Sequence, residues 1–130
     1  MGFSLDHIVI RSADVEGLLS FYSEVIGLGV ENADEFRRGE AFFPSLRVDP
    51  ATIIDLLPQA EGTAAPDRCN MDHFCLVVDA GDWQPLLDRL GRAGVELEMG
   101  PLELDGARGV GTGVYIRDPD GNRVELRYYA

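Results

Sequence analysis

Leu5-Asp6-His7-Ile8-Val9-Ile10-Arg11 is the stretch that decides the fold, because a second copy follows at Met71-Asp72-His73-Phe74-Cys75-Leu76-Val77. Each copy places an apolar residue, an aspartate and a histidine before a run rich in apolar residues, which is typical of the start of a β-strand. The two copies therefore predict that the chain contains one structural unit twice.

The repeat continues beyond these strands. A helical pattern in each half leads to a Gly-Val-Glu sequence, at Gly29-Val30-Glu31 and at Gly94-Val95-Glu96. Each half then ends in an apolar strand with one acid inside it, Ile54-Asp55-Leu56 and Val124-Glu125-Leu126. Two copies of one unit related by a pseudo-twofold axis would bring equivalent positions together. We therefore expect the two histidines and the two acids to belong to a single site.

The predicted fold is α+β, with the order βαβββ in each half and curved mixed sheets that enclose a cleft for a metal or ligand. We expect one domain over residues 1–130, with a first module at 1–58, a linker at 59–70 and a second module at 71–130. The predicted strands cover 5–11, 30–33, 40–48, 52–57, 72–78, 95–99, 113–117 and 123–128.

One helix is expected after each histidine strand. The first begins at Val15, with Ser12 or Asp14 as its N-cap, and ends at Gly27 or Gly29. The second is capped by Asp82 and continues through Ala93. We expect a polar connection over 32–39, a loop at the mouth of the pocket over 109–113, and a tight turn over 118–122.

Composition limits the classes of partner. The net charge of −12 comes from 23 acidic and 11 basic residues, and such a surface repels nucleic acid and anionic lipid. No apolar run approaches the length of a membrane span. The first residues do not resemble a secretory signal, so we expect a cytoplasmic protein. Two cysteines, Cys69 and Cys75, are too few for a disulfide scaffold, and we expect both to be reduced.

His7, Asp55, His73 and Glu125 are candidate metal ligands. Two imidazoles with one or two carboxylates suit a divalent zinc, iron, nickel, cobalt or manganese ion. An acid inside an apolar strand needs a partner, because an unpaired buried carboxylate is costly. The alternative is that both acids face solvent and the histidines are ordinary edge residues. The neighbouring aspartates are not expected to be ligands, because adjacent strand residues point to opposite faces.

These motifs resemble the vicinal oxygen chelate superfamily, which includes glyoxalase I, extradiol dioxygenases, fosfomycin-resistance thiol transferases and bleomycin-binding proteins. The resemblance rests on the two histidine strands, on Phe21-Tyr22-Ser23-Glu24-Val25-Ile26-Gly27-Leu28, and on Arg117-Asp118-Pro119-Asp120-Gly121-Asn122-Arg123-Val124-Glu125-Leu126. It implies that His7, His73 and Glu125 are the shared metal ligands. Asp55 occupies the place where glyoxalase I carries a fourth ligand, usually a longer glutamate.

The resemblance also implies a reaction. The metal would chelate two neighbouring oxygens of a small substrate, and a carboxylate, Glu125 or Asp55, would act as the base. Arg11, Cys75, Tyr115 and Tyr128 are the candidate substrate-binding residues. Cys75 can also be a small buried apolar residue, and strand tyrosines are often part of a core.

The expected function is therefore that of a metal-dependent, glyoxalase-like lyase or isomerase. An extradiol-type dioxygenase with Fe(II) and a metal-free protein that binds a small molecule such as an antibiotic are the alternatives. The resemblance suggests a homodimer, in which His7 and Asp55 of one chain meet His73 of the partner subunit and Glu125 of the partner subunit. A monomer that closes its own two modules is the other arrangement.

Overall fold

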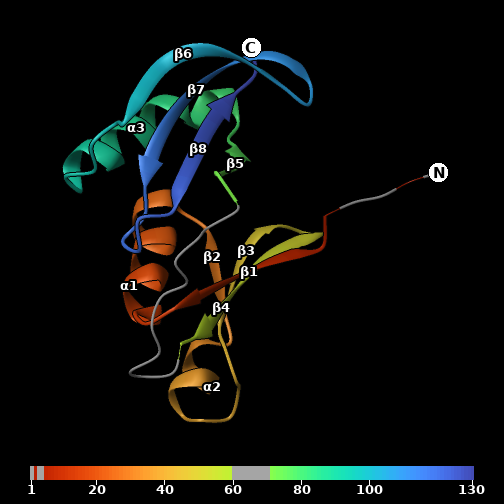
Figure 1. Ribbon diagram of the computed structural model, residues 1–130, viewed down its shortest axis with the longest axis vertical. Coiled ribbons are helices and arrows are strands. Elements are labelled where there is room, and N and C mark those ends of the chain that lie inside the picture. Colours follow the sequence, from red (N-terminus) through yellow and green to blue (C-terminus); the bar gives the residue numbers. More distant parts are fainter. Residues whose placement is uncertain (1, 3–4, 60–70) are drawn as a thin grey trace. The chain divides into compact units, whose positions relative to one another are not determined.

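A computed structural model describes residues 2, 5–59 and 71–130, and the chain divides into two compact units, Met1–Ala65 and Pro66–Ala130 (Figure 1). Each unit contains a four-stranded mixed sheet and short helices. The prediction of an α+β fold made of two similar modules is thus confirmed. The predicted linker lies, apart from its first residue, outside the described residues, and so does Cys69.

The first unit carries its sheet in the order β1-β4-β3-β2. Its elements are β1 (His7–Ser12), α1 (Val15–Ser20), a π-helical turn η1 (Phe21–Ile26), β2 (Gly29–Glu31), α2 (Ala33–Arg37), β3 (Ser45–Asp49) and β4 (Thr52–Pro58). The first strand runs parallel to β4, and the remaining neighbours are antiparallel.

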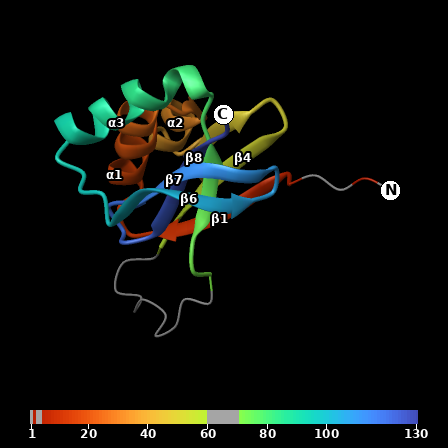
Figure 2. The same cartoon turned by 90° about the horizontal axis from the view of Figure 1, so that it is seen from above.

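The second unit repeats this topology in the order β5-β8-β7-β6. Its elements are β5 (Phe74–Val77), a 3-10 turn η2 (Ala80–Asp82), α3 (Trp83–Arg92), β6 (Met99–Gly106), β7 (Gly109–Arg117) and β8 (Arg123–Tyr128). Again the first strand is parallel to the last and the others are antiparallel. In the view from above, α3 extends along one side of this sheet (Figure 2).

The first helix begins and ends as its sequence predicts. The Asp14 side chain accepts a hydrogen bond of 2.9 Å from the Gly17 amide, which satisfies a free donor of the first turn. Val15, Leu18 and Leu19 are buried on one side of the helix. Gly27 ends the helical stretch with φ of 102°, a conformation that glycine adopts without a steric penalty.

Each sheet has two chemically different faces because strand side chains alternate. In the second unit, Val114, Ile116, Val124 and Leu126 are almost fully buried on what we call the core face. Residues between them, including Tyr115 and Glu125, point to the opposite face, which we call the site face. In the first unit the parallel register places Asp55 beside Val9, so Asp55 shares a site face with His7 and Arg11.

Four expectations about local structure are wrong. The polar connection over 32–39 contains α2, and the strand expected from residue 40 starts only at Ser45, after Pro44. No strand forms over 95–98. Instead β6 and β7 form a long hairpin that takes up the predicted loop over 109–113. The exposed residues of α2 and β6 lack the apolar period on which sequence patterns depend.

The described helices are all too short or too polar to cross a membrane.

Candidate functional site

His73 is held between two carboxylates at the start of β5. Its Nδ1 atom lies 2.6 Å from Asp72 Oδ2, and its Nε2 atom lies 3.4 Å from Glu125 Oε1. The imidazole also meets the Tyr115 ring edge-on, with 5.2 Å between the ring centres. Asp72 therefore fixes the ring and leaves Nε2 directed at Glu125, which is how a carboxylate prepares a histidine for metal binding.

Glu125 is the buried acid of this unit, with 5% of its surface exposed. Its Oε2 atom accepts hydrogen bonds from Arg127 Nε at 2.6 Å and from Cys75 Sγ at 3.2 Å. Burial acts to raise the pKa of Glu125, but hydrogen bonding from Arg127, Cys75 and Tyr115 outweighs it and lowers the pKa. Glu125 is thus ionised at neutral pH with one oxygen, Oε1, turned toward His73.

Cys75 lies on the site face, since it is paired with Glu125 across the parallel register. Burial of its thiol, together with the neighbouring Glu125 carboxylate, raises its pKa to about 12. The thiol therefore stays protonated and donates a hydrogen bond, so it is not a nucleophile at neutral pH. The alternative that Cys75 is only a buried apolar residue is wrong, because the residue as a whole remains exposed, although protein atoms crowd the thiol, and the thiol donates a hydrogen bond to Glu125.

The first unit offers a similar pair. His7 Nδ1 lies 2.7 Å from Asp6 Oδ2, so here too an aspartate holds Nδ1 and leaves Nε2 available. The hydrogen bond to Asp6 raises the pKa of His7, the charge of Asp55 adds to this, and burial opposes it. Asp55 is 7% exposed and accepts a hydrogen bond of 2.7 Å from Ser45. The alternative that Asp55 and Glu125 face solvent is therefore wrong.

Asp6 and Asp72 have a role that the sequence analysis did not predict. Alternation of side chains argued against Asp6 and Asp72 as metal ligands. Each instead hydrogen-bonds the Nδ1 atom of the histidine that follows it. The repeated Asp-His pair was the signal for this role, because a histidine that binds a metal through Nε2 usually gives Nδ1 to a carboxylate.

The predicted substrate-binding residues fall into two groups. Arg11, Cys75 and Tyr115 lie on the site faces of their sheets. Tyr128 does not, because it is three residues from Glu125 and so points to the core face, where its ring lies 4.8 Å from that of Trp83 in α3. Tyr128 is therefore not on the face that carries the other three candidates, and its contact with a substrate stays a prediction.

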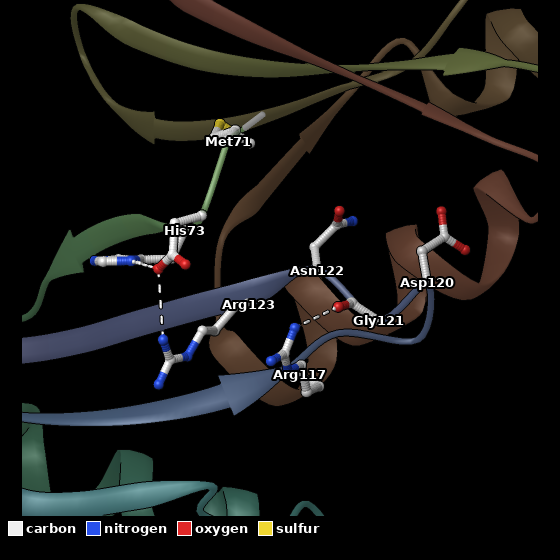
Figure 3. Close-up of a pocket in the computed structure, with 8 residues that line it drawn as sticks. Met71, His73, Arg117, Asp120, Gly121, Asn122 and Arg123 are labelled. Carbon is white, nitrogen blue, oxygen red and sulfur yellow. Dashed lines mark hydrogen bonds and ion pairs between the residues drawn. The ribbon is translucent and has the colours of Figure 1, made fainter. Parts of the chain in front are cut away.

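A cavity of ≈ 330 Å³ opens beside His73 in the second unit (Figure 3). Its lining comes from the start of β5 and from the β7–β8 turn: Met71, Asp72, His73, Arg117, Asp120, Gly121, Asn122 and Arg123. Arg117 is held by Glu98 and by the Gly121 carbonyl oxygen. Arg123 stacks over the Tyr115 ring at 4.2 Å and approaches Asp72 at 3.4 Å. These arginines are thus partnered within the protein.

The donors present suit a divalent metal, although no complete cluster is found. Within residues 2, 5–59 and 71–130, no group of three or more histidine, cysteine, aspartate or glutamate side chains is gathered so as to hold an ion. Each unit supplies one imidazole whose Nδ1 is bound by an aspartate and one buried carboxylate. That donor set matches the ligands that zinc, iron, nickel, cobalt and manganese take in proteins.

Comparison with known proteins identifies related chains. Virulence protein STM3117 of Salmonella typhimurium is 28% identical over 96% of this chain and 83% of its own, and its crystal structure superposes with a TM-score of 0.74 over 100% and 99% of the two chains. Glutathione transferase FosA of Serratia marcescens is 25% identical over 95% of this chain and 79% of its own.

A solved integron cassette protein from the mobile metagenome of V. Cholerae is 27% identical, with a TM-score of 0.77 over 100% of this chain and 98% of its own. The family model for the Glyoxalase/Bleomycin resistance protein/Dioxygenase superfamily matches residues 4–126, which is nearly the whole chain. The chain therefore belongs to the Glyoxalase/Bleomycin resistance protein/Dioxygenase superfamily, also called the vicinal oxygen chelate superfamily.

Proposed function

We propose that this protein is a metal-dependent enzyme of the vicinal oxygen chelate superfamily, a glyoxalase-like lyase or isomerase. The observation that carries the proposal is the pairing of His73 Nε2 with Glu125 Oε1 at 3.4 Å, with Nδ1 already bound by Asp72. The two ligand atoms face each other there, and the other side of each group is held by a hydrogen bond, from His73 Nδ1 to Asp72 and from Arg127 to Glu125 Oε2. His7 and Asp55 supply the corresponding donors in the first unit.

One divalent ion held by His7, His73 and Glu125, with Asp55 in the fourth place, would supply a Lewis acid for two neighbouring oxygens of a small substrate. The residues of the chain do the remaining work. Arg11 and Tyr115 would contact the substrate from the site faces, and Cys75 would keep Glu125 oriented through its protonated thiol. A carboxylate oxygen of Asp55 or Glu125 would accept the proton that the substrate loses.

A metal-free binding protein is the second candidate, and one contact favours it. The Arg127 guanidinium lies 2.6 Å from Glu125 and already neutralises its charge without a metal. Against this candidate, both histidines have Nδ1 bound by aspartate, an arrangement for which a pure binding protein has no need. A metal-free protein would bind its ligand with equal affinity before and after treatment with a chelator.

We also propose that the protein acts as a homodimer whose sites draw on both chains. Mixing a His7→Ala variant with a His73→Ala variant tests this arrangement. In a shared site, about a quarter of the wild-type activity should return on mixing equal amounts, because about half of the randomly re-paired dimers are mixed and each mixed dimer contains one intact and one doubly damaged site. Two inactive variants that stay inactive when mixed, although dimers purified through different affinity tags on the two chains contain both variants, would contradict it.

The experiment that tests the enzyme proposal loads the metal-free protein with zinc, nickel, cobalt, manganese or iron in turn. Each form is assayed with glutathione hemithioacetals and, for the iron form, with catechols while oxygen consumption is followed. Turnover that requires the metal and disappears in His73→Ala supports the proposal. Oxygen uptake by the iron form would identify the dioxygenase alternative. Metal binding without turnover of either substrate class would contradict the proposed activity.

A further inference from the structure

We propose that Arg127 is a positioning residue that binds one oxygen of Glu125 and so reserves the other oxygen for the metal. The inference rests on the proposed function, since it concerns how Glu125 presents itself as a ligand. Its consequence is a division of roles, in which Glu125 is the fixed ligand and Asp55 the carboxylate free to take a proton.

The two oxygens of Glu125 have different surroundings. Oε2 receives Arg127 Nε at 2.6 Å and Cys75 Sγ at 3.2 Å, whereas Oε1 faces His73 Nε2 at 3.4 Å. A charge-assisted hydrogen bond of this length is among the strong ones in proteins. A carboxylate held in this way offers a metal one oxygen, since the second is already bound by a cation and a thiol.

Arg127 is itself fixed. Its Nη1 atom donates to the Tyr129 hydroxyl at 3.0 Å and its Nη2 atom donates to the Asp105 carbonyl oxygen at 3.1 Å, and the residue is 3% exposed. Three different nitrogens thus bond three acceptors, from β8, from the segment after β8 and from β6. The planar guanidinium cannot turn without breaking at least one of these bonds.

The glycine-rich β6–β7 hairpin leaves room for this arrangement. A Cβ atom at Gly106 would lie 1.8 Å from Arg127 Nη1, and one at Gly111 would lie 3.1 Å from the Tyr129 ring. Side chains at these positions would occupy the space that Arg127 and Tyr129 now fill. The glycines at these two positions therefore make room for Arg127 and Tyr129.

Among the described residues of the first unit, no arginine takes the equivalent position. Asp55 corresponds to Glu125 in the sheet register, and the residue two positions later is Leu57 where the second unit has Arg127. Asp55 receives one hydrogen bond from the Ser45 hydroxyl. A single neutral donor restrains a carboxylate far less than a buried guanidinium does, so Asp55 is the acid that can move.

The test compares Arg127→Met, Arg127→Lys and Tyr129→Phe with wild type, and uses Tyr128→Phe as the matched control because Tyr128 lies on the core face. Co²⁺ affinity is measured by competition with a chelating dye, and the visible absorption of the Co²⁺ complex reports its coordination. We expect Arg127→Met to bind Co²⁺ about 10- to 100-fold more weakly, the usual effect of losing a partner behind a ligand. Its absorption should also change, because Glu125 can then offer both oxygens.

Arg127→Lys should recover part of the affinity, Tyr129→Phe should lose less than Arg127→Met, and Tyr128→Phe should match wild type. A purely structural role would lower thermal stability and leave the absorption of the folded complex unchanged. If Arg127→Met does not fold, Arg127→Lys and Tyr129→Phe test the inference instead. Wild-type affinity and absorption in both of them would overturn this inference alone, whereas a wild-type protein that binds none of the five metals would overturn the proposed function with it.

Discussion

Replacing Gly106 with alanine should destabilise the second unit by moving Arg127. The added Cβ would lie 1.8 Å from Arg127 Nη1 and 2.5 Å from the Tyr129 hydroxyl, distances that force one of the groups to shift by more than an ångström. The bonds of Arg127 to Glu125 and Tyr129 are 2.6 and 3.0 Å long and would not survive such a shift. A hydrogen bond to a charged group contributes about 1.5–3 kcal/mol, so we expect a loss of about 2 kcal/mol.

Urea unfolding followed by tryptophan fluorescence and circular dichroism measures this loss. The midpoint should fall while the slope stays constant, and the melting temperature should drop by about 6–10 °C for a domain of this size. Gly81→Ala is the control, because a Cβ there meets nothing within 4 Å, and its effect should stay within about 0.5 kcal/mol. Equal stabilities of the two variants would show that Arg127 is not confined by the hairpin, and would refute the reasoning.

Three further predictions concern helix capping, acid stability and metal removal. Asp14→Ala should cost about 1 kcal/mol of unfolding free energy because its side chain caps α1, whereas Asp82→Ala should cost almost nothing because Asp82 makes no capping bond to α3; chemical denaturation compares them. The hydrogen bond from Arg37 lowers the pKa of Glu16 from its usual 4.5, so its contribution is complete above pH 4.5 and lost as the pH falls through the lowered value. The stability difference between wild type and Arg37→Ala should therefore shrink in acid, and a difference that grows would contradict this. Removing a bound metal with a chelator should lower the melting temperature, and adding the ion back should restore it in proportion to the logarithm of its concentration; a melting temperature insensitive to both would count against a metal site.

The sequence repeat predicted the two similar α+β modules and their histidine strands, because the Asp-His motif and the apolar run after it occur once in each half. The turn over 118–122 also formed as expected, with Asp118 accepting from the amides of Asp120 and Asn122. The sequence did not predict α2 or the full length of β6, because neither element has a regular pattern of buried apolar residues. Tyr128 lies on the opposite face of the strand from Glu125, as the odd separation of the two residues already indicated.

The sequence also did not predict which side chains hydrogen-bond to the candidate ligands. Alternation in strands argued only against Asp6 and Asp72 as metal ligands and said nothing of their bonds to the histidines, which lie at the edge of the strands: His7 is the first residue of β1 and His73 precedes β5. Arg127 looked like an ordinary charged strand residue. Its place beside Glu125 depends on the β6–β7 hairpin, which brings the Asp105 carbonyl from 22 residues away, and local sequence patterns do not report such contacts.

The central claim is that one histidine and one carboxylate from each unit hold a divalent metal. The most direct test is the metal content of protein loaded with zinc, nickel, cobalt, manganese or iron and then freed of excess ion. Glu125→Gln keeps an oxygen for Arg127, and Glu40→Gln is the control because Glu40 is an exposed acid that pairs with Arg38. We predict a single ion per chain in wild type and in Glu40→Gln, and its loss in Glu125→Gln. No bound ion in wild type with any of the five metals, or full occupancy in Glu125→Gln, would contradict the account.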